Sequence, residues 1–582
     1  MELGVLESPP FGACAEWGDV IEIRGWIARP QASSVRARIG TGSWQNLASG
    51  LSRPDLPLGP HGPLVGFGGH LRSGLPGQCG SGGDGSLLAD LEVEVLLDNE
   101  ERLRWRRSIR FEPSGHSAWR WVENSVNSAK NASSVSVTWV IQGEGTAWLT
   151  TKQSVEAVCG PSVAAVAGTA ESHPPAQTDW IGFLVAGDRL CAAGWLSLCD
   201  ELARGTDACL IYADHVDHEG AIVFKPAAAP VFHNASLMWD RGWLVRQQTW
   251  SRRPPDLHGS DWWHSLVASA AHAPWPLCID GGPRRQRNAP QSRSSKRPTL
   301  RESVSVVIPT RLSDRSLLEG LLRSLPVESE CGDLDVEPVL VLNNLVADMF
   351  DLPRGHTACK DVRLLRHEGS FNWSAINNWA VRQTESEWLL FLNDDIEVLR
   401  PGWISAMHRT ALLPGVGIVG AVLRYPDGLL QHAGVWMGRE GRARHTFRYC
   451  TGDEPNVRPL LREDRPQAAV TGACLLIRRE DFRRLGGFDV SLPVVCNDID
   501  LCLRARLHGL LSVVCAGAEL VHHEGLSRGG IAENQDHQRF HDRWKRLIPQ
   551  QAPERHPALD TGRDDWRADP ASPWPTRLRV AR

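Results

Sequence analysis

Short runs of alternating hydrophobic and polar residues characterise the first part of the chain. The runs at 20–27 and 91–97 alternate with a period of two, and segments rich in glycine, proline and serine separate them. Side chains on a strand point to opposite faces in turn, so this period is typical of a sheet with one buried face. Residues 1–113 are therefore predicted to form a small antiparallel β-sandwich.

The pattern then changes to a mixture of strands and helices. Residues 118–281 contain β-type runs such as 135–141. In residues 302–548, an apolar strand at 303–310 is followed by a leucine-rich helix and by a second apolar strand at 338–344. A repeated order of strand, helix and strand is typical of a parallel sheet. We therefore predict two α/β domains in succession.

Two segments have the composition of connections. Residues 282–301 are rich in arginine, serine and proline, which predicts a solvated linker with a local positive charge. Residues 549–582 are rich in proline, aspartate and arginine. We expect this C-terminal tail to be poorly ordered or to lie on the surface.

An internal repeat connects the two α/β domains. Residues 179–198 align without a gap over residues 387–406, at a constant offset of 208. The identical residues are Trp180, Phe183, Leu184, Gly194, Trp195 and Ser197, matched by Trp388, Phe391, Leu392, Gly402, Trp403 and Ser405. We predict a duplicated domain whose first copy has kept the frame and lost the chemistry, because Ala186 and Gly187 face Asp394 and Asp395. Asp188 is the next residue after Gly187, so weak residual binding by the first copy stays open.

Charge and cysteine content restrict the class of protein. The chain has 582 residues and a net charge of −5, without a strongly basic domain, so nucleic acid is not an expected partner. Its 14 cysteines have no paired spacing and are predicted to be reduced core residues of a cytosolic protein. The start of the chain lacks the features of a signal peptide, and no apolar run reaches the length of a membrane span. Any membrane contact is expected to be peripheral.

The first candidate site is the end of the apolar run at 388–392. Asn393, Asp394 and Asp395 follow it directly. Ligands bind at the carboxyl ends of strands in open α/β sheets, and two acids there suit a hard cation that carries a diphosphate. The alternative is that these residues only form a turn or a helix cap.

The second candidate lies in residues 371–381. Ser374 is expected to cap a helix and to place Asn377 and Asn378 in its first turn. Helix N-termini attract phosphate, but the amides could equally serve as local caps.

Two further groups come later in the chain. Residues 497–509 have one apolar helical face, which places Asp498 at the helix entrance and Asp500 in the first turn. One of these acids could be a general base, or both could simply favour the positive end of the helix dipole. His522 and His523 follow an apolar strand and could complete a metal site or lie on the surface.

Together these segments resemble glycosyltransferase family 2, whose members have the GT-A fold, and in particular bacterial enzymes of the rhamnosyltransferase-like, polysaccharide-building type. The segments that carry the resemblance are residues 308–310, 371–378, 391–395, 431–434, 470–479, 497–500 and 522–529. The resemblance covers about residues 303–545. A stretch from 179 to 226 is also similar to a GT-A half found upstream in tandem members of the family.

The resemblance implies roles for individual residues. Asp395 and His522 would bind Mg²⁺ or Mn²⁺, with His523 as an alternative to His522, and Asp498 would be the catalytic base. Donor-binding positions would be Pro309, Thr310, Asn343, Asn372, Asn377, Asp394 and Arg528. Acceptor-side positions would be Gln431, His432 and Asp500. Asn343 stands where the family usually has an aspartate that reads the base, so the nucleotide base stays open.

The resulting expectation is an inverting, metal-dependent glycosyltransferase. It would transfer a sugar from a nucleotide-diphospho-sugar to a glycan or lipid-linked glycan hydroxyl, in the cytoplasm or at the inner face of the plasma membrane. A nucleotide-sugar hydrolase or pyrophosphorylase is a second hypothesis, although residues 310–314 contain no glycine for a phosphate loop. A third is a non-catalytic scaffold that binds glycan or nucleotide sugar, with both copies degenerate.

Overall fold

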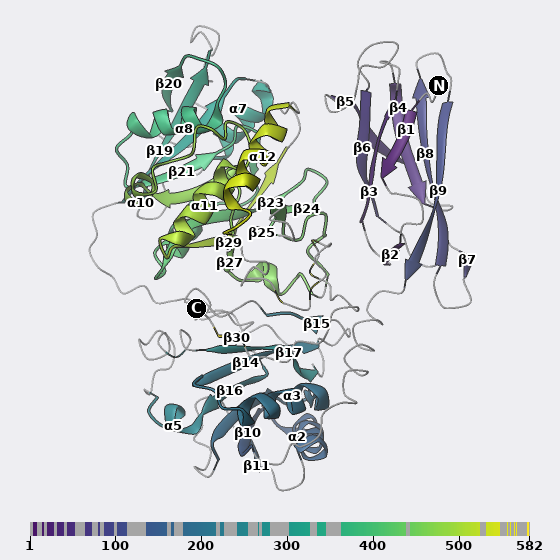
Figure 1. Ribbon diagram of the computed structural model, residues 1–582, viewed down its shortest axis with the longest axis vertical. Coiled ribbons are helices and arrows are strands. Elements are labelled where there is room, and N and C mark those ends of the chain that lie inside the picture. Colours follow the sequence, from purple (N-terminus) through teal and green to yellow (C-terminus); the bar gives the residue numbers. More distant parts are fainter. Residues whose placement is uncertain are drawn as a thin grey trace. The chain divides into compact units, whose positions relative to one another are not determined.

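Figure 1 shows the computed structural model of the protein. It describes residues 4–8, 14–16, 20–27, 32–39, 44–52, 65–72, 80–81, 87–97, 102–112, 135–159, 164–167, 178–216, 222–225, 241–253, 266, 270–279, 302–312, 314–325, 334–344, 362–437, 443–454, 456–523, 531–547, 556, 559, 564, 566 and 579–580. The chain divides into two compact units, Met1–Ser117 with Ser527–Gln535, and Ala118–Leu526 with Asp536–Arg582. The predicted linker at 282–301 lies outside the described residues.

The N-terminal unit is built from strands. They are β1 (Gly4–Ser8), β2 (Cys14–Glu16), β3 (Val20–Ile27), β4 (Ala32–Ile39), β5 (Gln45–Ser52), β6 (Val65–Arg72), β7 (Gly80–Ser81), β8 (Leu87–Leu97) and β9 (Arg102–Glu112). Their order is β1-β3-β6-β5-β4-β8-β9-β2, and every pair except β2 with β9 is antiparallel. The antiparallel pairing agrees with the prediction, while the sandwich packing of two layers stays a prediction.

The first α/β domain begins after this unit. Its strands are β10 (Val137–Gln142), β11 (Ala164–Ala167), β12 (Trp180–Val185), β13 (Arg189–Leu190), β14 (Leu210–Val216), β15 (Ile222–Val223), β16 (Trp243–Arg246) and β17 (Ala271–Ile279). Its helices are α2 (Gly145–Cys159), α3 (Ala192–Ala203) and α5 (Gln247–Trp250). The strand order is β11-β10-β12-β16-β14-β17-β13, with β15 beside β14 and β30 (Arg579–Val580) beside β17.

The second α/β domain has a larger set of elements. Its strands are β18 (Glu302–Thr310), β19 (Leu334–Asn343), β20 (Arg363–His367), β21 (Trp388–Leu392), β22 (Ile396–Val398), β23 (Val416–Arg424), β24 (Leu430–His432), β25 (Val435–Met437), β26 (Ala443–His445), β27 (Arg465–Gln467), β28 (Cys474–Arg478) and β29 (Leu511–His522). Its helices are α7 (Arg315–Ser324), α8 (Trp373–Arg382), α9 (Trp403–Ala411), η7 (Leu460–Arg462), α10 (Arg479–Arg484), α11 (Asn497–Leu507) and α12 (Ile531–Trp544). The main strand order is β20-β19-β18-β21-β28-β23-β29-β22. The prediction of a parallel sheet holds for β20, β19, β18 and β21 but is wrong for the whole sheet, because β28 and β22 run antiparallel to their neighbours.

The two α/β sheets share one strand order. The series β11-β10-β12-β16-β14-β17-β13 matches β19-β18-β21-β28-β23-β29-β22 strand for strand. The directions of the six neighbouring pairs also match, from the parallel pair at one end to the antiparallel pair at the other. The two sheets therefore have the same topology, apart from the additional strands of each.

The register of the two sheets also agrees with the repeat. Trp180 pairs with Arg246 across β12 and β16, and Trp388 pairs with Arg478 across β21 and β28. The guanidinium of Arg246 lies 4.8 Å from the ring centre of Trp180, and that of Arg478 lies 4.6 Å from the ring of Trp388. The tryptophans are 208 positions apart, so this offset describes equivalent places in the two sheets.

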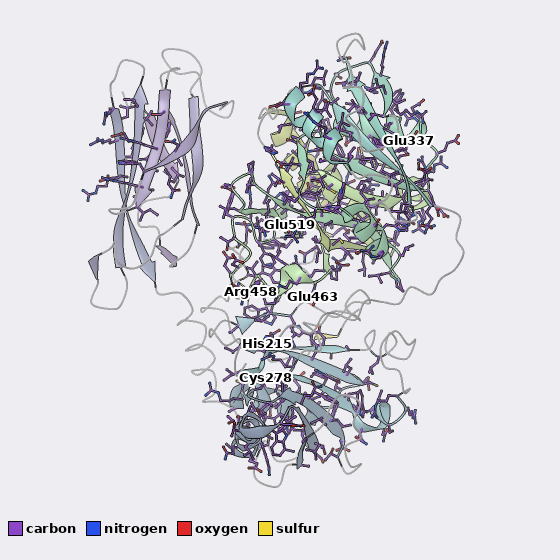
Figure 2. All side chains as sticks on the ribbon, turned by 180° about the vertical axis from the view of Figure 1, so that it is seen from behind. His215, Cys278, Glu337, Arg458, Glu463 and Glu519 are labelled. Atoms are coloured by element: carbon purple, nitrogen blue, oxygen red, sulfur yellow. The ribbon has the colours of Figure 1, made fainter. Side chains whose placement is uncertain are left out.

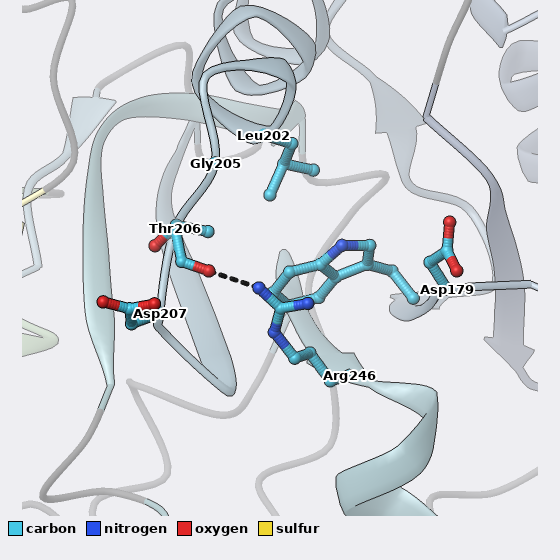
Figure 3. Close-up of a pocket in the computed structure, with 7 residues that line it drawn as sticks. Asp179, Leu202, Gly205, Thr206, Asp207 and Arg246 are labelled. Carbon is cyan, nitrogen blue, oxygen red and sulfur yellow. Dashed lines mark hydrogen bonds between the residues drawn. The ribbon is translucent and has the colours of Figure 1, made fainter.

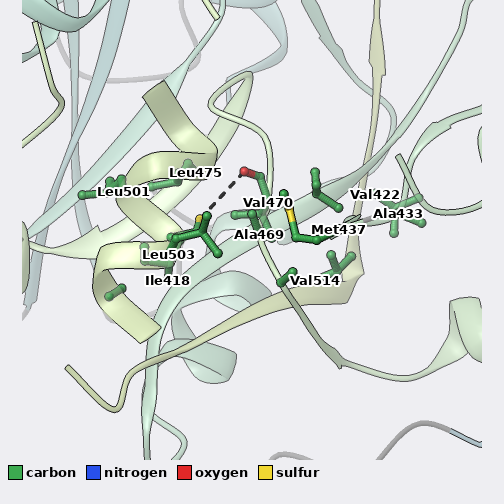
Figure 4. Packing of buried hydrophobic residues seen from close by; sticks show 14 of the residues in the cluster. Ile418, Val422, Ala433, Met437, Ala469, Val470, Leu475, Leu501, Leu503 and Val514 are labelled. Atoms are coloured by element: carbon green, nitrogen blue, oxygen red, sulfur yellow. Dashed lines mark hydrogen bonds between the residues drawn. The ribbon is translucent and has the colours of Figure 1, made fainter. Parts of the chain in front are cut away.

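A buried apolar core supports the second sheet. All five side chains of β21 are buried, and each apolar side chain of this size stabilises the fold by roughly 1.5–3 kcal/mol. Val422 of β23 and Val514 of β29 belong to the same apolar cluster (Figure 4). Near the ends of these strands, Glu519, which is labelled in Figure 2, forms an ion pair with Arg424 at 2.5 Å. The strands that lead to the candidate site are thus held by packing and by pairing.

Buried thiols support the prediction that cysteines lie in the core. Cys474, Cys502 and Cys515 are buried in the second domain. Burial raises the pKa of the Cys502 and Cys515 thiols to about 12. These two side chains are therefore protonated, inert core residues at neutral pH.

The C-terminal tail differs from its prediction. Three of its residues are almost completely buried: His556, Leu559 and Trp566. Asp564 forms a salt bridge with Arg444 at 2.6 Å, and β30 pairs with β17. The expectation of a poorly ordered or surface segment is wrong for these residues, because the tail carries apolar side chains that fit into folded domains.

In the part of the chain that the structure describes, no helix combines the length and the apolar character needed to span a bilayer.

Candidate functional site

The predicted aspartate pair stands at the carboxyl end of β21. Thr310, at the end of the neighbouring strand β18, donates a hydrogen bond from Oγ1 to Asp394 Oδ2 at 2.6 Å. Burial raises the pKa of Asp394, the bond from Thr310 lowers it, and the charge of Asp395 raises it again. The net shift is upward, as expected for two carboxylates that share a partly buried place. A nearby cation would favour the ionised form of both.

His522 lies beside Asp395, as the resemblance implies. β22 and β29 pair antiparallel, which brings the end of β29 to the aspartates. His522 Nε2 is 3.1 Å from Asp395 Oδ1, and the histidine side chain is only 4% exposed. His523 instead contacts Glu397 at 3.1 Å. The geometry therefore favours His522 over His523 as the partner of Asp395.

Gln431 fixes the orientation of the His522 ring. Its Oε1 lies 2.8 Å from His522 Nδ1, and its Nε2 donates to the backbone oxygen of His522 at 3.4 Å. Because an amide oxygen only accepts, Nδ1 carries the ring proton of the neutral histidine. Nε2 then presents a lone pair toward the Asp395 carboxylate, and Asn393 Nδ2 lies 3.3 Å from that nitrogen.

With a neutral His522 ring, two electron-rich atoms face each other at 3.1 Å and repel unless a positive charge, from a divalent cation or from a second ring proton, compensates them. A carboxylate with a neutral imidazole that is held by a buried amide is also the usual arrangement of metal ligands and their support. Asp395 and His522 therefore fit a divalent cation.

Asp498 is the second residue of α11, at the helix entrance where the sequence predicts it. Its Oδ2 accepts a hydrogen bond from the Gly472 amide at 2.7 Å, and its Oδ1 accepts from the Ile499 amide at 2.8 Å. Ala473, the next residue after Gly472, accepts a bond from the Asn393 amide at 3.0 Å. Gly472 permits this approach, since an added Cβ would lie 3.3 Å from Asp498 Cβ. A short chain of contacts thus connects Asp498 to the aspartate pair.

Several predicted donor-binding amides bind backbone groups. Asn343 is 3% exposed, and its Nδ2 lies 3.3 Å from the oxygens of His367 and Gly369. Asn377 is completely buried and donates to Trp373 O at 2.9 Å. These contacts orient the two amides, and their part in donor binding stays a prediction.

The N-cap of α8 is a different residue from the one predicted. Asn372 caps the helix, with its Oδ1 accepting from the Ala375 amide at 2.9 Å. The prediction of Ser374 as the cap is wrong, because Ser374 is buried inside the first turn and donates to Leu492 O at 2.6 Å. Pro309 lies within β18 next to Thr310. Arg528 lies outside the described residues.

The acceptor-side positions are deeply buried. His432 is 1% exposed, its Nδ1 lies 2.8 Å from Nδ1 of His445, and burial together with the charge of His445 holds its pKa well below the ordinary value. Asp500 is 0% exposed and accepts from Arg504, Arg543 and Trp544 at 2.8, 2.8 and 2.9 Å. These contacts attach α12 to α11, and a role toward the acceptor stays a prediction for both residues.

A separate pocket lies in the first α/β domain (Figure 3). It has a volume of about 410 Å³ and is lined by Asp179, Trp180, Leu202, Gly205, Thr206, Asp207 and Arg246. The guanidinium of Arg246 donates to the backbone oxygens of Thr206 and Ala208. Trp180 begins β12, so the pocket stands at the amino end of that strand. Ligands of open α/β sheets bind at the opposite end.

Sequence reasoning did not foresee the contacts of Thr310 with Asp394 or of Gln431 with His522. The two residues of each contact are far apart in sequence, and none of the four was predicted to position another. The signal that could have found Thr310 is its place at the end of the predicted strand at 303–310, since the carboxyl ends of parallel strands meet at one edge of a sheet.

Comparison with known proteins addresses the second domain. Residues 301–545 match the family model described as "Glycosyltransferase like family 2". This region of the chain is a glycosyltransferase family 2 domain.

Curated relatives match part of the chain. An uncharacterised protein of Sinorhizobium fredii is 41% identical over 39% of this chain and 25% of its own length. The O-antigen biosynthesis protein RfbC of Myxococcus xanthus is 39% identical over 39% of this chain and 18% of its own length. An N-acetylglucosaminyl-diphospho-decaprenol L-rhamnosyltransferase of Mycobacterium tuberculosis is 30% identical over 25% of this chain and 49% of its own length. The chain thus spans half or less of each relative.

Solved structures resemble part of the chain at lower sequence identity. GalNAc-T7, solved with UDP, GalNAc and Mn²⁺, has a TM-score of 0.33 at 15% identity and covers 44% of this chain and 53% of its own. The mannosyltransferase PcManGT of Pyrobaculum calidifontis, solved with GDP-Man and Mn²⁺, has a TM-score of 0.31 at 18% identity. The match covers 45% of this chain and 68% of the mannosyltransferase chain.

Proposed function

We propose that the glycosyltransferase family 2 domain is an inverting, metal-dependent glycosyltransferase of the GT-A type. It transfers a sugar from a nucleotide-diphospho-sugar to a hydroxyl of a glycan or of a lipid-linked glycan. The observation that carries the proposal is the pair of Asp395 and His522, 3.1 Å apart at the carboxyl end of a buried strand. The names of the O-antigen biosynthesis protein and of the rhamnosyltransferase among the relatives support an acceptor of the cell-surface polysaccharide type.

Asp395 and His522 would hold Mg²⁺ or Mn²⁺, with Gln431 keeping the histidine lone pair directed at the site. The bound cation supplies positive charge that stabilises the diphosphate leaving group. Asp394, held by Thr310, faces the same edge and is proposed to contact the donor sugar or ribose.

Asp498 is proposed as the general base. The acceptor oxygen forms a bond to the anomeric carbon while the bond from that carbon to the diphosphate oxygen breaks, and the acceptor proton moves to Asp498. An ionised carboxylate offers about four lone-pair sites. The amides of Gly472 and Ile499 each donate to one of its oxygens, which orients the carboxylate that is proposed to take the acceptor proton.

The first α/β domain is proposed to be a degenerate copy of the same fold. Its strand order, strand directions and stacked Arg246 and Trp180 support this origin. Ala186 and Gly187 take the places of Asp394 and Asp395, and neither side chain can bind a cation. The enzyme is proposed to work in the cytoplasm, with any membrane contact peripheral at the inner face of the plasma membrane.

A panel of nucleotide sugars, each with Mg²⁺ or Mn²⁺, tests the proposal. The full chain should release nucleotide diphosphate from at least one donor in the presence of a glycan or lipid-linked acceptor. Asp498→Asn should lower the rate of transfer by about 10²–10⁴-fold and leave donor binding by calorimetry nearly unchanged.

Asp453→Asn, which alters an exposed carboxylate, is the matched control and should keep full turnover. Unchanged turnover in Asp498→Asn would reject that residue as the base. Metal-dependent donor binding without any transfer across the panel would instead support the non-catalytic scaffold.

A further inference from the structure

A second cluster of metal-type ligands lies in the first α/β domain. Asp214 on β14, His272 on β17 and His556 in the C-terminal tail bring one ligand atom each to within 4.8 Å of one another. Asp214 Oδ1 lies 2.9 Å from His272 Nε2, and Asp214 Oδ2 lies 2.8 Å from His556 Nε2. The carboxylate thus turns one oxygen to each imidazole.

The cluster is closed to solvent. Asp214 and His272 are 0% exposed and His556 is 2% exposed. The ring of Tyr212 stacks on His272 with centres 4.8 Å apart, and Phe224 lies 4.4 Å from the His556 ring. These aromatic walls exclude water from a carboxylate, which is costly unless positive charge or strong donors compensate.

Neighbouring charges are largely engaged with one another. Asp188 forms a buried salt bridge with Arg241 at 3.0 Å. The ammonium of Lys225 donates to Arg241 O at 2.8 Å, while its backbone amide donates to Asp214 Oδ1 at 2.7 Å. The amide bond orients the carboxylate and leaves both of its oxygens with capacity for a further partner.

The fold itself does not require polar residues at these places. Tyr212 pairs with His272 in the first sheet, and Gly420 pairs with Val514 in the second. Asp214 likewise corresponds to Val422, at the offset of 208. In the second domain both positions are therefore valines inside an apolar cluster (Figure 4). An aspartate and a histidine at equivalent buried places point to a ligand that the second sheet does not bind there.

We propose that Asp214, His272 and His556 bind one divalent transition-metal ion, of which Zn²⁺ suits the donor set best. Two imidazole nitrogens and a carboxylate are ligands that Zn²⁺ takes, whereas Mg²⁺ prefers oxygen alone. This site differs in ligands and in place from the cation proposed at Asp395. Since His556 comes from the tail, the metal attaches the end of the chain to the first α/β domain.

A proton offers the competing explanation. One charged imidazole beside Asp214 would also neutralise the carboxylate and would make the cluster an ordinary buried ion pair. Metal content separates the two, because a proton-held cluster retains no zinc.

The first experiment measures metal in the full-length protein by mass spectrometry after exhaustive dialysis against a weak chelator. We expect on the order of one zinc per chain, and background levels in His556→Ala and His272→Ala. His522→Ala is the matched control: it alters the other proposed cation site and should retain the zinc. Adding Zn²⁺ to stripped wild-type protein should raise its melting temperature, and should leave that of His556→Ala unchanged.

A cobalt spectrum guards against variants that fail to fold. In His556→Cys, which keeps a ligand at this position, Co²⁺ should give a thiolate charge-transfer band that the wild type lacks. Zinc at background in the wild type, together with no stabilisation by Zn²⁺, Co²⁺ or Ni²⁺, would overturn the proposal in favour of the proton-held pair. So would a Co²⁺ spectrum that is identical in the wild type and in His556→Cys.

Discussion

The two α/β domains share a sheet topology and differ in where their buried polar groups stand. At the end of β21 the second domain has Asp394 and Asp395, where the first has Ala186 and Gly187. On the central strands the relation is reversed. The first domain has Asp214 and His272 where the second has Val422 and Val514.

This exchange shows which residues maintain the fold and which are free to change. Apolar strand residues and the stacked Trp–Arg pairs occur in both sheets. Polar side chains at strand ends, or in place of a core valine, vary without altering the strand order. The chemistry of such a sheet is therefore set by a few positions and cannot be inferred from topology.

The largest effect is expected from moving a carboxylate into the wrong domain. Val422→Asp places an acid in the apolar cluster of the second domain, where Val422 is 4% exposed. An unpaired buried charge should lower the unfolding free energy by about 3–5 kcal/mol. Denaturant unfolding of the second domain measures it, with Val422→Ala as the control that should cost only about 1–2 kcal/mol. Equal losses in the two variants would show that the valine site tolerates charge.

The second prediction tests the strand ends. Asp395→Asn should lower the rate of sugar transfer by about 10²–10³-fold, because the proposed cation loses its carboxylate ligand. Ala186→Asp places an acid near the matching end of β12 in the first domain and should add no transfer in the Asp395→Asn background. Initial rates at saturating donor measure both. A rate restored by Ala186→Asp would contradict the assignment of the reaction to the second domain alone.

The third prediction concerns the support of His522. Gln431→Leu removes the oxygen that lies 2.8 Å from Nδ1, so the ring loses its fixed tautomer. The affinity for Mn²⁺ in the presence of nucleotide diphosphate should fall by about 10–100-fold. Gln431→Glu keeps an acceptor and should recover part of the loss. Calorimetry on the three proteins decides the matter, and equal affinities would leave Gln431 without a positioning role.

The smallest effect is a pH dependence of stability in the second domain. Burial, with the charge of His445 in addition, holds the pKa of His432 well below that of an unfolded histidine, which is about 6.5. Below that pH the unfolded chain binds a proton that the folded chain does not. The unfolding free energy should therefore fall by up to about 1.4 kcal/mol for each pH unit, until the folded pKa is reached. Urea midpoints between about pH 5 and 7 measure the slope, which His432→Gln should reduce.

Local patterns predicted much of the fold. The strand at 388–392, the aspartates behind it and the helix that begins near Asp498 are short-range features, and each stands where it was expected. The internal repeat could be aligned at an offset of 208 because tryptophan and phenylalanine occupy matching strand positions in the two sheets. Local patterns and the repeat could not show which of the later strands lie next to each other in each sheet.

Contacts between residues that are far apart in the sequence could not be predicted from local patterns. Nothing in the local pattern distinguishes Asp498, which faces the Gly472 amide, from Asp500, which binds Arg543 and Trp544. Gln431 reaches His522 only because β24 and β29 both lie beside β23. Such pairs depend on the tertiary structure, which brings together residues that are far apart in the sequence.

The buried tail has a practical consequence for dissecting this protein. Asp564 binds Arg444 and Trp566 packs on Phe447 in the glycosyltransferase domain, whereas His556 and β30 contact the first α/β domain. A fragment cut at the end of the family match would uncover Phe447 and leave Arg444 without its carboxylate. Poor solubility of such a fragment would then reflect the loss of the C-terminal tail and its contacts, and would say nothing about its catalytic competence.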